Sequence, residues 1–318
     1  MTRLGLIAGN GTFPFLVLDA ARAQGFEVVV AAIREEAFPE IASKGAASVH
    51  WVSLGELSKL IDILKAEGVT RAVMAGQVKH KQIFSSIKPD WRLAKLLLSL
   101  GTRNTDSLLG AVAKVLADEG IVLESSTALL EPLLARAGVL TRRAPSEQER
   151  KNIEYGRAVG RRLAEYDIGQ TVVIAEAACV AVEAMEGTDA TIARAGEIMK
   201  SLAVAESLVE APTLRKKREG WGTLDSQGLD SQTLDSQPPD SQAPTRVPLL
   251  SRALTVVKIA KPGQDMRFDV PVIGVKTIET MAWAGASCLA VDAGRCLLLD
   301  GDMMTRAADE AGIAVCAA

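Results

Sequence analysis

The sequence predicts an α/β protein with two domains: an N-terminal open parallel, Rossmann-like α/β domain and a C-terminal α/β or α+β domain, joined by a helical linker. From Leu4 onward, short apolar runs alternate with amphipathic runs, the pattern of βα units that build a parallel sheet. The chain is also 318 residues long, which is long for a single domain. We place the N-terminal domain at 1–143, the linker helix at 144–166 and the C-terminal domain at 167–318.

The N-terminal domain contains strand candidates separated by helix candidates. Gly25 ends the first helix, because glycine readily takes the left-handed conformation that follows a helix. The expected strands are 4–8, 26–32, 49–52, 72–75 and 121–123, and the expected helices are 15–24, 57–65 and 107–118.

The linker helix has a clear start signal. Ser146 followed three residues later by Glu149 is a capping box, and the charged helix it opens runs to about Tyr166. Beyond it, we expect strands at 171–183, 254–260, 288–291 and 296–299 and a helix at 190–200.

A repeat interrupts the C-terminal domain between Thr223 and Gln242, where Asp-Ser-Gln recurs four times with a period of five. A period of five fits neither a helix nor a strand, and the tract has too few apolar side chains to form a core. We therefore predict a disordered surface insertion over about 211–247.

Composition excludes several classes of function. The 36 basic and 39 acidic side chains give a net charge of −3, too balanced for the attraction on which nucleic-acid binding rests, so we expect no nucleic-acid partner. The two histidines and four cysteines lack the spacing of a zinc site, and two histidines make a histidine-based catalytic triad improbable. No signal peptide or membrane span is recognisable, so we expect a cytoplasmic protein.

A glycine turn, Gly9-Asn10-Gly11-Thr12, follows the first strand and precedes the first helix. Glycines at such a turn let backbone N–H groups approach phosphate oxygens, and the helix N-terminus adds a favourable dipole. Pro14 replaces the third glycine of the dinucleotide fingerprint, and no acidic residue ends the second strand. The turn predicts a phosphate site and favours NAD only weakly; a tight turn with proline at the start of the helix is the alternative.

A second glycine, Gly76, follows another strand, with Lys79 three residues further on. Because ligands of open parallel sheets bind at the carboxyl ends of the strands, we expect both glycine turns to face one cleft, with Lys79 available to an anion. The alternative is that Lys79 and His80 form a solvated pair.

Two windows of the C-terminal domain, 183–189 and 258–271, are dense in charged and turn residues. Carboxylates of this kind suit Mg²⁺, which takes one or two of them and shares its other positions with water and phosphate. The basic residues would neutralise phosphate charge in a phosphoryl transfer. The residue types alone also fit surface turns with ion pairs.

Four segments resemble the LpxI family of UDP-2,3-diacylglucosamine pyrophosphatases: 4–14, 167–170, 181–190 and 258–274. The most specific strings are EGTDA at 186–190 and KPGQDMRFDVPVIG at 261–274. The resemblance covers the whole chain apart from the insertion. Relatives have two consecutive acids where this chain has Thr105 and Asp106, and a short connection in place of the repeats.

The resemblance implies Mg²⁺-dependent hydrolysis of the pyrophosphate bond of UDP-2,3-diacylglucosamine to UMP and 2,3-diacylglucosamine 1-phosphate (lipid X) in lipid A biosynthesis. Water would attack the α-phosphorus in a site between the domains, and Asp269 would be the catalytic and metal-binding acid. Further metal ligands are expected among Asp189, Glu186 and Asp265. Substrate binding is expected from Gly9, Gly11, Thr12, Gly76, Lys79, Thr188, Lys258, Lys261 and Arg267.

A diacylated substrate implies contact with the inner surface of the cytoplasmic membrane, so we expect peripheral association; a homo-oligomer is also compatible with the sequence. Two alternative functions stay open on the residues alone. One is a nicotinamide-dependent oxidoreductase that uses the Gly9 turn for a pyrophosphate. The other is a non-enzymatic protein that carries the nucleotide or lipid without consuming it.

Overall fold

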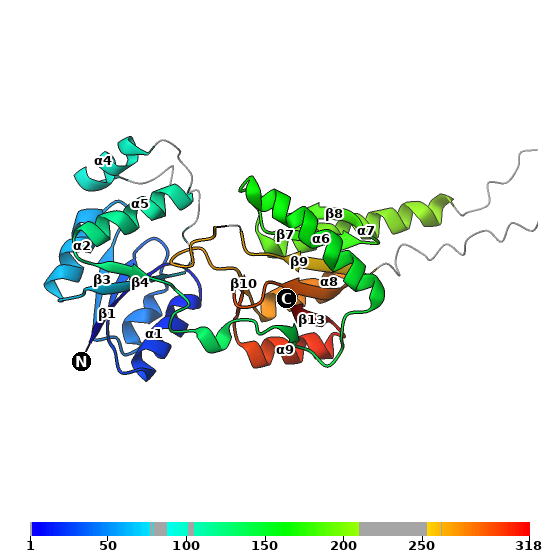
Figure 1. Ribbon diagram of the computed structural model, residues 1–318, viewed down its shortest axis with the longest axis horizontal. Helices are drawn as coiled ribbons and strands as arrows, with labels where there is room; N and C mark the ends of the chain where they lie inside the picture. The colour runs from blue at the N-terminus through cyan, green and yellow to red at the C-terminus, as the bar shows by residue number, and fades with distance from the viewer. Residues whose placement is uncertain (1, 77, 79–87, 101–104, 210–252, 262) are drawn as a thin grey trace, which may run out of the picture.

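The computed structural model describes residues 2–76, 78, 88–100, 105–209, 253–261 and 263–318. They form two α/β units, one built by the N-terminal part of the chain and the other by the C-terminal part (Figure 1). The predicted α/β fold class is confirmed. The predicted insertion at 211–247 and Lys79 lie outside the described residues.

The N-terminal sheet has five parallel strands in the order β3-β2-β1-β4-β5. The chain moves outward from β1 in one direction and then returns to the other side of it, so the strand order reverses between β1 and β4. In open α/β sheets such a switch point is where ligands bind. The elements are β1 (Arg3–Ala8), α1 (Phe13–Ala23), β2 (Glu27–Ile33), β3 (Ser48–Val52), α2 (Leu57–Ala66), β4 (Arg71–Ala75), α4 (Trp91–Ser99), α5 (Thr105–Asp118) and β5 (Val122–Glu124).

Helices cover both faces of this sheet, which explains why its central strands are apolar at successive positions. Leu6 points to the face that α1 covers with Val17 and Leu18. Its neighbour Ile7 points to the opposite face, where Ile61 of α2 and Leu116 of α5 pack. Every residue from Leu4 to Ala8 is therefore buried.

The C-terminal sheet has six strands in the order β6-β13-β11-β9-β7-β8. The three strands β13, β11 and β9 are parallel to one another, while β6, β7 and β8 run antiparallel to their neighbours. A separate short pair joins β10 to β12. The elements are β6 (Gly138–Val139), α6 (Glu147–Glu165), β7 (Thr171–Ala175), β8 (Ala178–Val182), α7 (Thr188–Val209), β9 (Leu254–Lys258), β10 (Val272–Ile273), α8 (Val275–Ala284), β11 (Ala286–Val291), β12 (Leu297–Leu298), α9 (Gly301–Glu310) and β13 (Ala314–Ala317).

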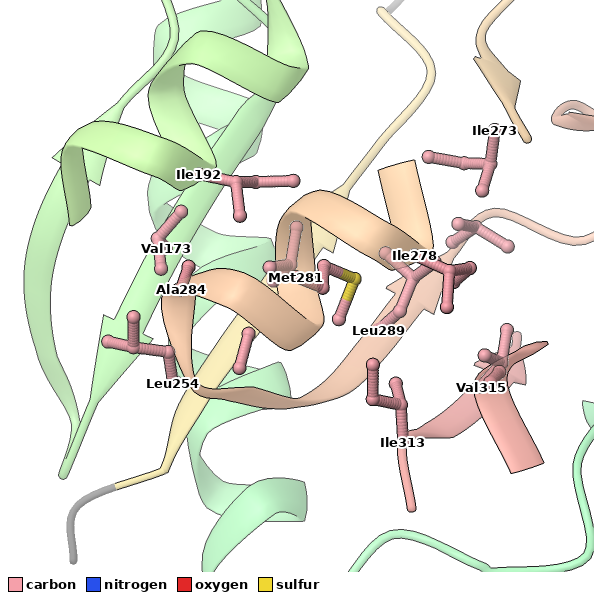
Figure 2. Packing of buried hydrophobic residues seen from close by; sticks show 14 of the residues in the cluster. Val173, Ile192, Leu254, Ile273, Ile278, Met281, Ala284, Leu289, Ile313 and Val315 are labelled. Carbon is pink, nitrogen blue, oxygen red and sulfur yellow. The ribbon is translucent and has the colours of Figure 1, made fainter. Parts of the chain in front are cut away.

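The core of this unit lies between one face of the sheet and the helices α7, α8 and α9. Figure 2 shows Ile278 and Met281 of α8 packed near Leu289 of the sheet. Helix α7 approaches α8 closely, because Gly196 has no side chain: a Cβ atom there would lie 2.7 Å from the Cα atom of Ala284.

The helix predicted as a linker packs against the other face of the C-terminal sheet. A Cβ atom at Gly156 of α6 would lie 2.7 Å from Cγ2 of Val257, so glycine allows the helix to lie close to β9. Strand β6, within the range assigned to the N-terminal domain, pairs with β13. The chain therefore joins the second unit from about residue 138, and α6 forms one of its layers.

The stretch 171–183, expected as one strand, forms the hairpin of β7 and β8. Its turn residues Glu176 and Ala177 have φ angles of 47° and 59° without being glycine. The buried side chain of Asn152 on α6 stabilises this turn, since its Oδ1 accepts from the Ala177 N–H at 2.9 Å and its Nδ2 donates to Thr255 at 3.1 Å.

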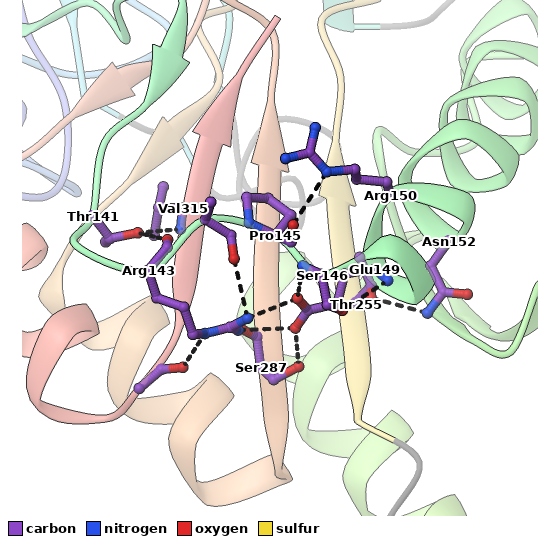
Figure 3. Close-up of polar contacts among 12 residues, drawn as sticks. Thr141, Arg143, Pro145, Ser146, Glu149, Arg150, Asn152, Thr255, Ser287 and Val315 are labelled. Carbon is purple, nitrogen blue, oxygen red and sulfur yellow. Dashed lines mark hydrogen bonds and ion pairs between the residues drawn. The ribbon is translucent and has the colours of Figure 1, made fainter.

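A buried polar network fixes the start of α6 on the sheet (Figure 3). The guanidinium of Arg143 donates to both carboxylate oxygens of Glu149, at 2.7 and 2.9 Å, and to the carbonyl oxygen of Ser287. Glu149 also completes the predicted capping box with Ser146. Burial raises the pKa of Glu149, but hydrogen bonds from Arg143, Ser287 and Ser146 outweigh it and lower the pKa from 4.5 to about 2.

This network predicts a specific acid sensitivity of the fold. Because the folded-state pKa of Glu149 is depressed, its contribution to stability is fully present above pH 4.5 and is lost as the pH falls toward 2. Glu149→Gln should lower the free energy of unfolding at pH 7 by about 1–3 kcal/mol. It should also flatten the loss of stability between pH 4.5 and 2, as measured by urea unfolding.

The control is Glu147→Gln, an exposed acid in the same first turn, which should change stability little. Stability profiles of wild type and Glu149→Gln that stay parallel over the acid range would contradict the proposed role of the Glu149 carboxylate.

Candidate active site

The two glycine turns lie in contact at the switch point of the N-terminal sheet. The Gly9 N–H donates to the carbonyl oxygen of Ala75 at 2.8 Å, which ties the end of β1 to the end of β4. Gly76 has a φ of +95°, and a Cβ atom there would lie 2.6 Å from the Asn10 carbonyl oxygen. Only glycine fits this close approach. The two turns therefore lie against each other at the carboxyl ends of β1 and β4.

The first turn leaves open space on its outer side. Gly11 has a φ of +94°, and a Cβ atom on it would have no neighbouring atom within 4 Å in the described part of the chain. Thr12 precedes α1 and makes no side-chain cap, while Asn10 donates to the Glu36 carbonyl oxygen at 3.0 Å. The turn is thus anchored on one side and accessible on the other, at the N-terminus of a helix of 11 residues.

The segment 261–272 extends from the carboxyl end of β9 to the N-terminal sheet (Figure 1). Ser126, which follows β5, donates its N–H to the Met266 carbonyl oxygen at 2.9 Å. Its hydroxyl lies 2.5 Å from the Met74 carbonyl oxygen and 2.6 Å from that of Arg267. Because the hydroxyl has one hydrogen, it donates to one of these two carbonyl oxygens at a time. Together with the N–H bond to Met266, this places Ser126 between the end of β4 and this segment.

Apolar side chains fix the same segment. Phe268 packs against the core on the α2 and α5 face of the N-terminal sheet, while Val270 and Val272 pack against the core on the α1 face. Asp269 lies between two anchored residues and is therefore held where the two units meet.

Asp269 is 24% exposed, and its Oδ2 atom is buried without a hydrogen-bond partner in the part of the chain that the structure describes. The ammonium of Lys261 lies 3.7 Å from this oxygen and 2.5 Å from Oδ1 of Asp167. Lys261 thus stands between two carboxylates. Asp167 was not among the predicted site residues, although the resembling segment 167–170 was a signal for it.

Arg267 and Asp265, predicted as a phosphate and a metal ligand, pair with each other. The Arg267 guanidinium donates to Asp265 at 2.8 Å through Nε and at 2.5 Å through a terminal nitrogen. This hydrogen bond lowers the pKa of Asp265 and raises the pKa of Arg267. Both side chains are partly exposed, at 40% for Arg267 and 32% for Asp265.

Lys258 and Thr188 also lie together, but inside the C-terminal unit. The buried ammonium of Lys258 donates to the Thr188 hydroxyl at 2.9 Å and to the Val272 carbonyl oxygen at 3.1 Å. Thr188 in turn donates to the buried carboxylate of Glu183 at 3.0 Å. This chain of contacts joins β9 to α7 and to β10.

The other two predicted metal ligands have partners elsewhere. Glu186 pairs with Arg194 at 2.6 Å, and Asp189 accepts from the Thr277 hydroxyl of α8 at 2.9 Å. Among the described residues, no group of three or more metal-binding side chains is gathered. The structure therefore does not bring Asp189, Glu186, Asp265 and Asp269 into one cluster.

Asp269 alone could serve as the protein ligand of a magnesium ion whose other ligands are water and phosphate. Mg²⁺ is usually held by one or two carboxylates, with water and substrate phosphate in its other positions. The buried oxygen of Asp269 that lacks a hydrogen-bond partner among the described residues is a suitable single ligand. The residues thus fit a metal that reaches the site together with a phosphate ligand.

Comparison with known proteins gives a consistent match over most of the chain. The model of the LpxI N-terminal domain matches residues 3–133, and that of the LpxI C-terminal domain matches residues 136–216 and 242–316. The family model leaves out 217–241, which holds most of the Asp-Ser-Gln tract. UDP-2,3-diacylglucosamine pyrophosphatase LpxI of Caulobacter vibrioides is 30% identical over 99% of this chain and 97% of its own length.

A solved structure, the biotin carboxylase domain dimer of Hydrogenobacter thermophilus 2-oxoglutarate carboxylase, matches with 12% identity and a TM-score of 0.25 over 63% of this chain and 42% of its own. This likeness is too low to support an argument. The two LpxI domain models together match most of the chain, in order, and the Caulobacter relative matches along nearly its whole length. The chain therefore belongs to the LpxI family.

Proposed function

We propose that this protein hydrolyses the pyrophosphate bond of UDP-2,3-diacylglucosamine, releasing UMP and 2,3-diacylglucosamine 1-phosphate, in lipid A biosynthesis. The substrate is the one in the name of the Caulobacter relative. The observation that carries the proposal is the Asp269 carboxylate, which lies at the boundary of the two units with a buried oxygen that has no hydrogen-bond partner in the described chain.

In the proposed reaction, water attacks the α-phosphorus while Asp269 accepts a hydrogen bond from that water and takes up its proton. The bond between the α-phosphorus and the bridging oxygen breaks. The bridging oxygen leaves with the diacylglucosamine phosphate, and the oxygen of water stays with UMP. Lys261 and Arg267 stand within the same segment and would offset the negative charge of the diphosphate.

The glycine turns would hold the remainder of the nucleotide. Backbone N–H groups at the open side of Gly11 and at the N-terminus of α1 are suited to a phosphate. A magnesium ion held by Asp269 would supply further neutralisation of the diphosphate.

Replacing Asp269 tests this assignment. Asp269→Asn keeps the shape of the side chain and removes its charge, so kcat for UMP release should fall by about 10²- to 10⁴-fold, the usual contribution of a general base. In water enriched in heavy oxygen, the wild type should place the label in UMP and not in the diacylglucosamine phosphate. Phosphorus NMR measures both the rate of UMP release and which of the two products carries the heavy oxygen.

The matched control is Asp302→Asn, an exposed acid in the first turn of α9, which should keep the wild-type rate. Label in the sugar phosphate would show attack at the β-phosphorus and contradict the mechanism. Recovery of intact substrate would indicate a carrier, and binding of NADH with no hydrolysis would indicate the oxidoreductase.

We further propose that the protein meets its diacylated substrate at the inner surface of the cytoplasmic membrane. None of the described helices is long and apolar enough to span a bilayer. Helix α4 offers a surface of the kind that lies on one: Leu93 points into the core, whereas Trp91 and Leu98 are 79% and 84% exposed. Lys95 is exposed between them, so the outer face combines apolar and cationic groups that suit anionic lipid.

This proposal predicts that the double variant Trp91→Ala, Leu98→Ala binds vesicles of phosphatidylglycerol and phosphatidylethanolamine about 100-fold or more weakly, since each exposed side chain would lose roughly 1.5–3 kcal/mol of burial. Sedimentation with vesicles measures the bound fraction. Met303→Ala, an exposed apolar side chain on α9, is the control and should bind as the wild type does. Equal binding of all three proteins would exclude α4 as the contact surface.

A further inference from the structure

Three buried polar atoms on the segments 167–170 and 261–269 have no hydrogen-bond partner within the described residues: Oε1 of Gln170, Nε2 of Gln264 and Oδ2 of Asp269. Buried polar groups in folded proteins are nearly always paired, so each such atom calls for an explanation. Two of the three lie on the segment that carries the proposed catalytic acid.

The chemistry of the three atoms differs. Oδ2 of Asp269 and Oε1 of Gln170 are acceptors, which suit a water, a hydroxyl or a cation. Nε2 of Gln264 is a donor and cannot accept. A diphosphate offers acceptor oxygens only. Of these three atoms, Nε2 of Gln264 is therefore the one that suits a phosphate oxygen.

The orientation of the Gln264 amide follows from its neighbours. Its Oε1 accepts from the backbone N–H of Lys261 at 2.9 Å, and the backbone N–H of Gln264 donates back to the Lys261 carbonyl oxygen at 3.1 Å. Turning the amide over would place its NH₂ group against the N–H of Lys261, where two donors would face each other. The amide is thus fixed with Oε1 on the Lys261 N–H, and Nε2 is the donor that has no partner among the described residues.

The same turn presents cationic groups. Lys261 carries an ammonium beside Asp269, and the Arg267 guanidinium lies partly exposed three residues after Gln264. A neutral amide with two N–H groups adds hydrogen bonds for an anion without adding charge. We propose that Nε2 of Gln264 donates to a non-bridging oxygen of the substrate's diphosphate and so fixes the α-phosphorus opposite Asp269.

This inference rests on the proposed function for the identity of the substrate, but its test has a second readout. Gln264→Glu keeps the acceptor for the Lys261 N–H and replaces the donor by a carboxylate, which repels phosphate. We expect kcat/KM for UDP-2,3-diacylglucosamine to fall by about 100-fold or more, or roughly 2.7 kcal/mol. The affinity for uridine diphosphate, measured by calorimetry, should fall at least tenfold.

Gln264→Met removes both hydrogen bonds at similar length and should lose less activity than Gln264→Glu, because it adds no repulsion. The melting temperature of Gln264→Glu should stay within about 3 °C of the wild type, since the turn keeps its acceptor. Gln148→Glu makes the same charge change at an exposed position of α6 and should alter neither rate nor affinity.

The outcomes separate the two claims. If the wild type hydrolyses the substrate and Gln264→Glu keeps its rate and its affinity for uridine diphosphate within threefold, Gln264 has only a structural role and the inference is overturned. If the wild type does not hydrolyse the substrate, the proposed function fails. In that case the titration with uridine diphosphate alone tests whether Gln264 binds a diphosphate. A loss of affinity in Gln264→Glu supports this role, and an unchanged affinity overturns it.

Discussion

The hydrogen bonds between Ser126 and the backbone of 266–267 are the contact on which the geometry of the candidate site depends. The segment 261–272 is fixed to the C-terminal sheet at both ends, by the Ala260 N–H on Asp292 and by Lys258 on the Val272 carbonyl oxygen. Its middle is fixed to the N-terminal sheet through Ser126. Asp269 therefore keeps its place only while both sheets hold this segment, which places its carboxylate at their boundary.

The charged side chains of this region differ in how readily they could exchange a partner for a ligand. The Arg267–Asp265 pair is partly exposed, so a phosphate could approach the guanidinium and compete with Asp265 for it. Lys258 is buried and holds two elements together, so releasing it would disturb the packing of β9. The Arg267 guanidinium is thus more accessible to a ligand than the Lys258 ammonium, whose hydrogen bonds join β9 to α7 and β10.

The sequence predicted the features that rest on local patterns. Strand and helix periodicity located the N-terminal strands and the helices α1, α2 and α5, whereas α4 was not predicted; the Ser146 and Glu149 spacing located the start of α6. The β7–β8 turn was missed because Glu176 and Ala177 lack the usual glycine or asparagine; Asn152, more than twenty residues away, supplies the support. The role of Ser126 was also missed, because its partners on 266–267 lie about 140 residues later in the chain and no local pattern connects them. The carboxylates of 186–189 and 265–269 looked like one set, but each of the first pair bonds to a nearby residue of the C-terminal unit.

Helix α7 and strand β9 flank residues 210–252 in the sequence, and both elements make their contacts with the candidate site at the opposite end. Helix α7 begins at Thr188, which contacts Lys258, and runs away from the site for 22 residues, or roughly 33 Å. Strand β9 enters the sheet at Leu254 and reaches the site only at its carboxyl end, about 16 Å later. The ends of α7 and β9 that flank residues 210–252 thus lie away from the contacts of Thr188 and Lys258. Because the contacts of Lys258, Ser126 and Asp269 are all made at the opposite edge, a family member can carry extra residues between α7 and β9 without changing the segment that holds its candidate catalytic acid.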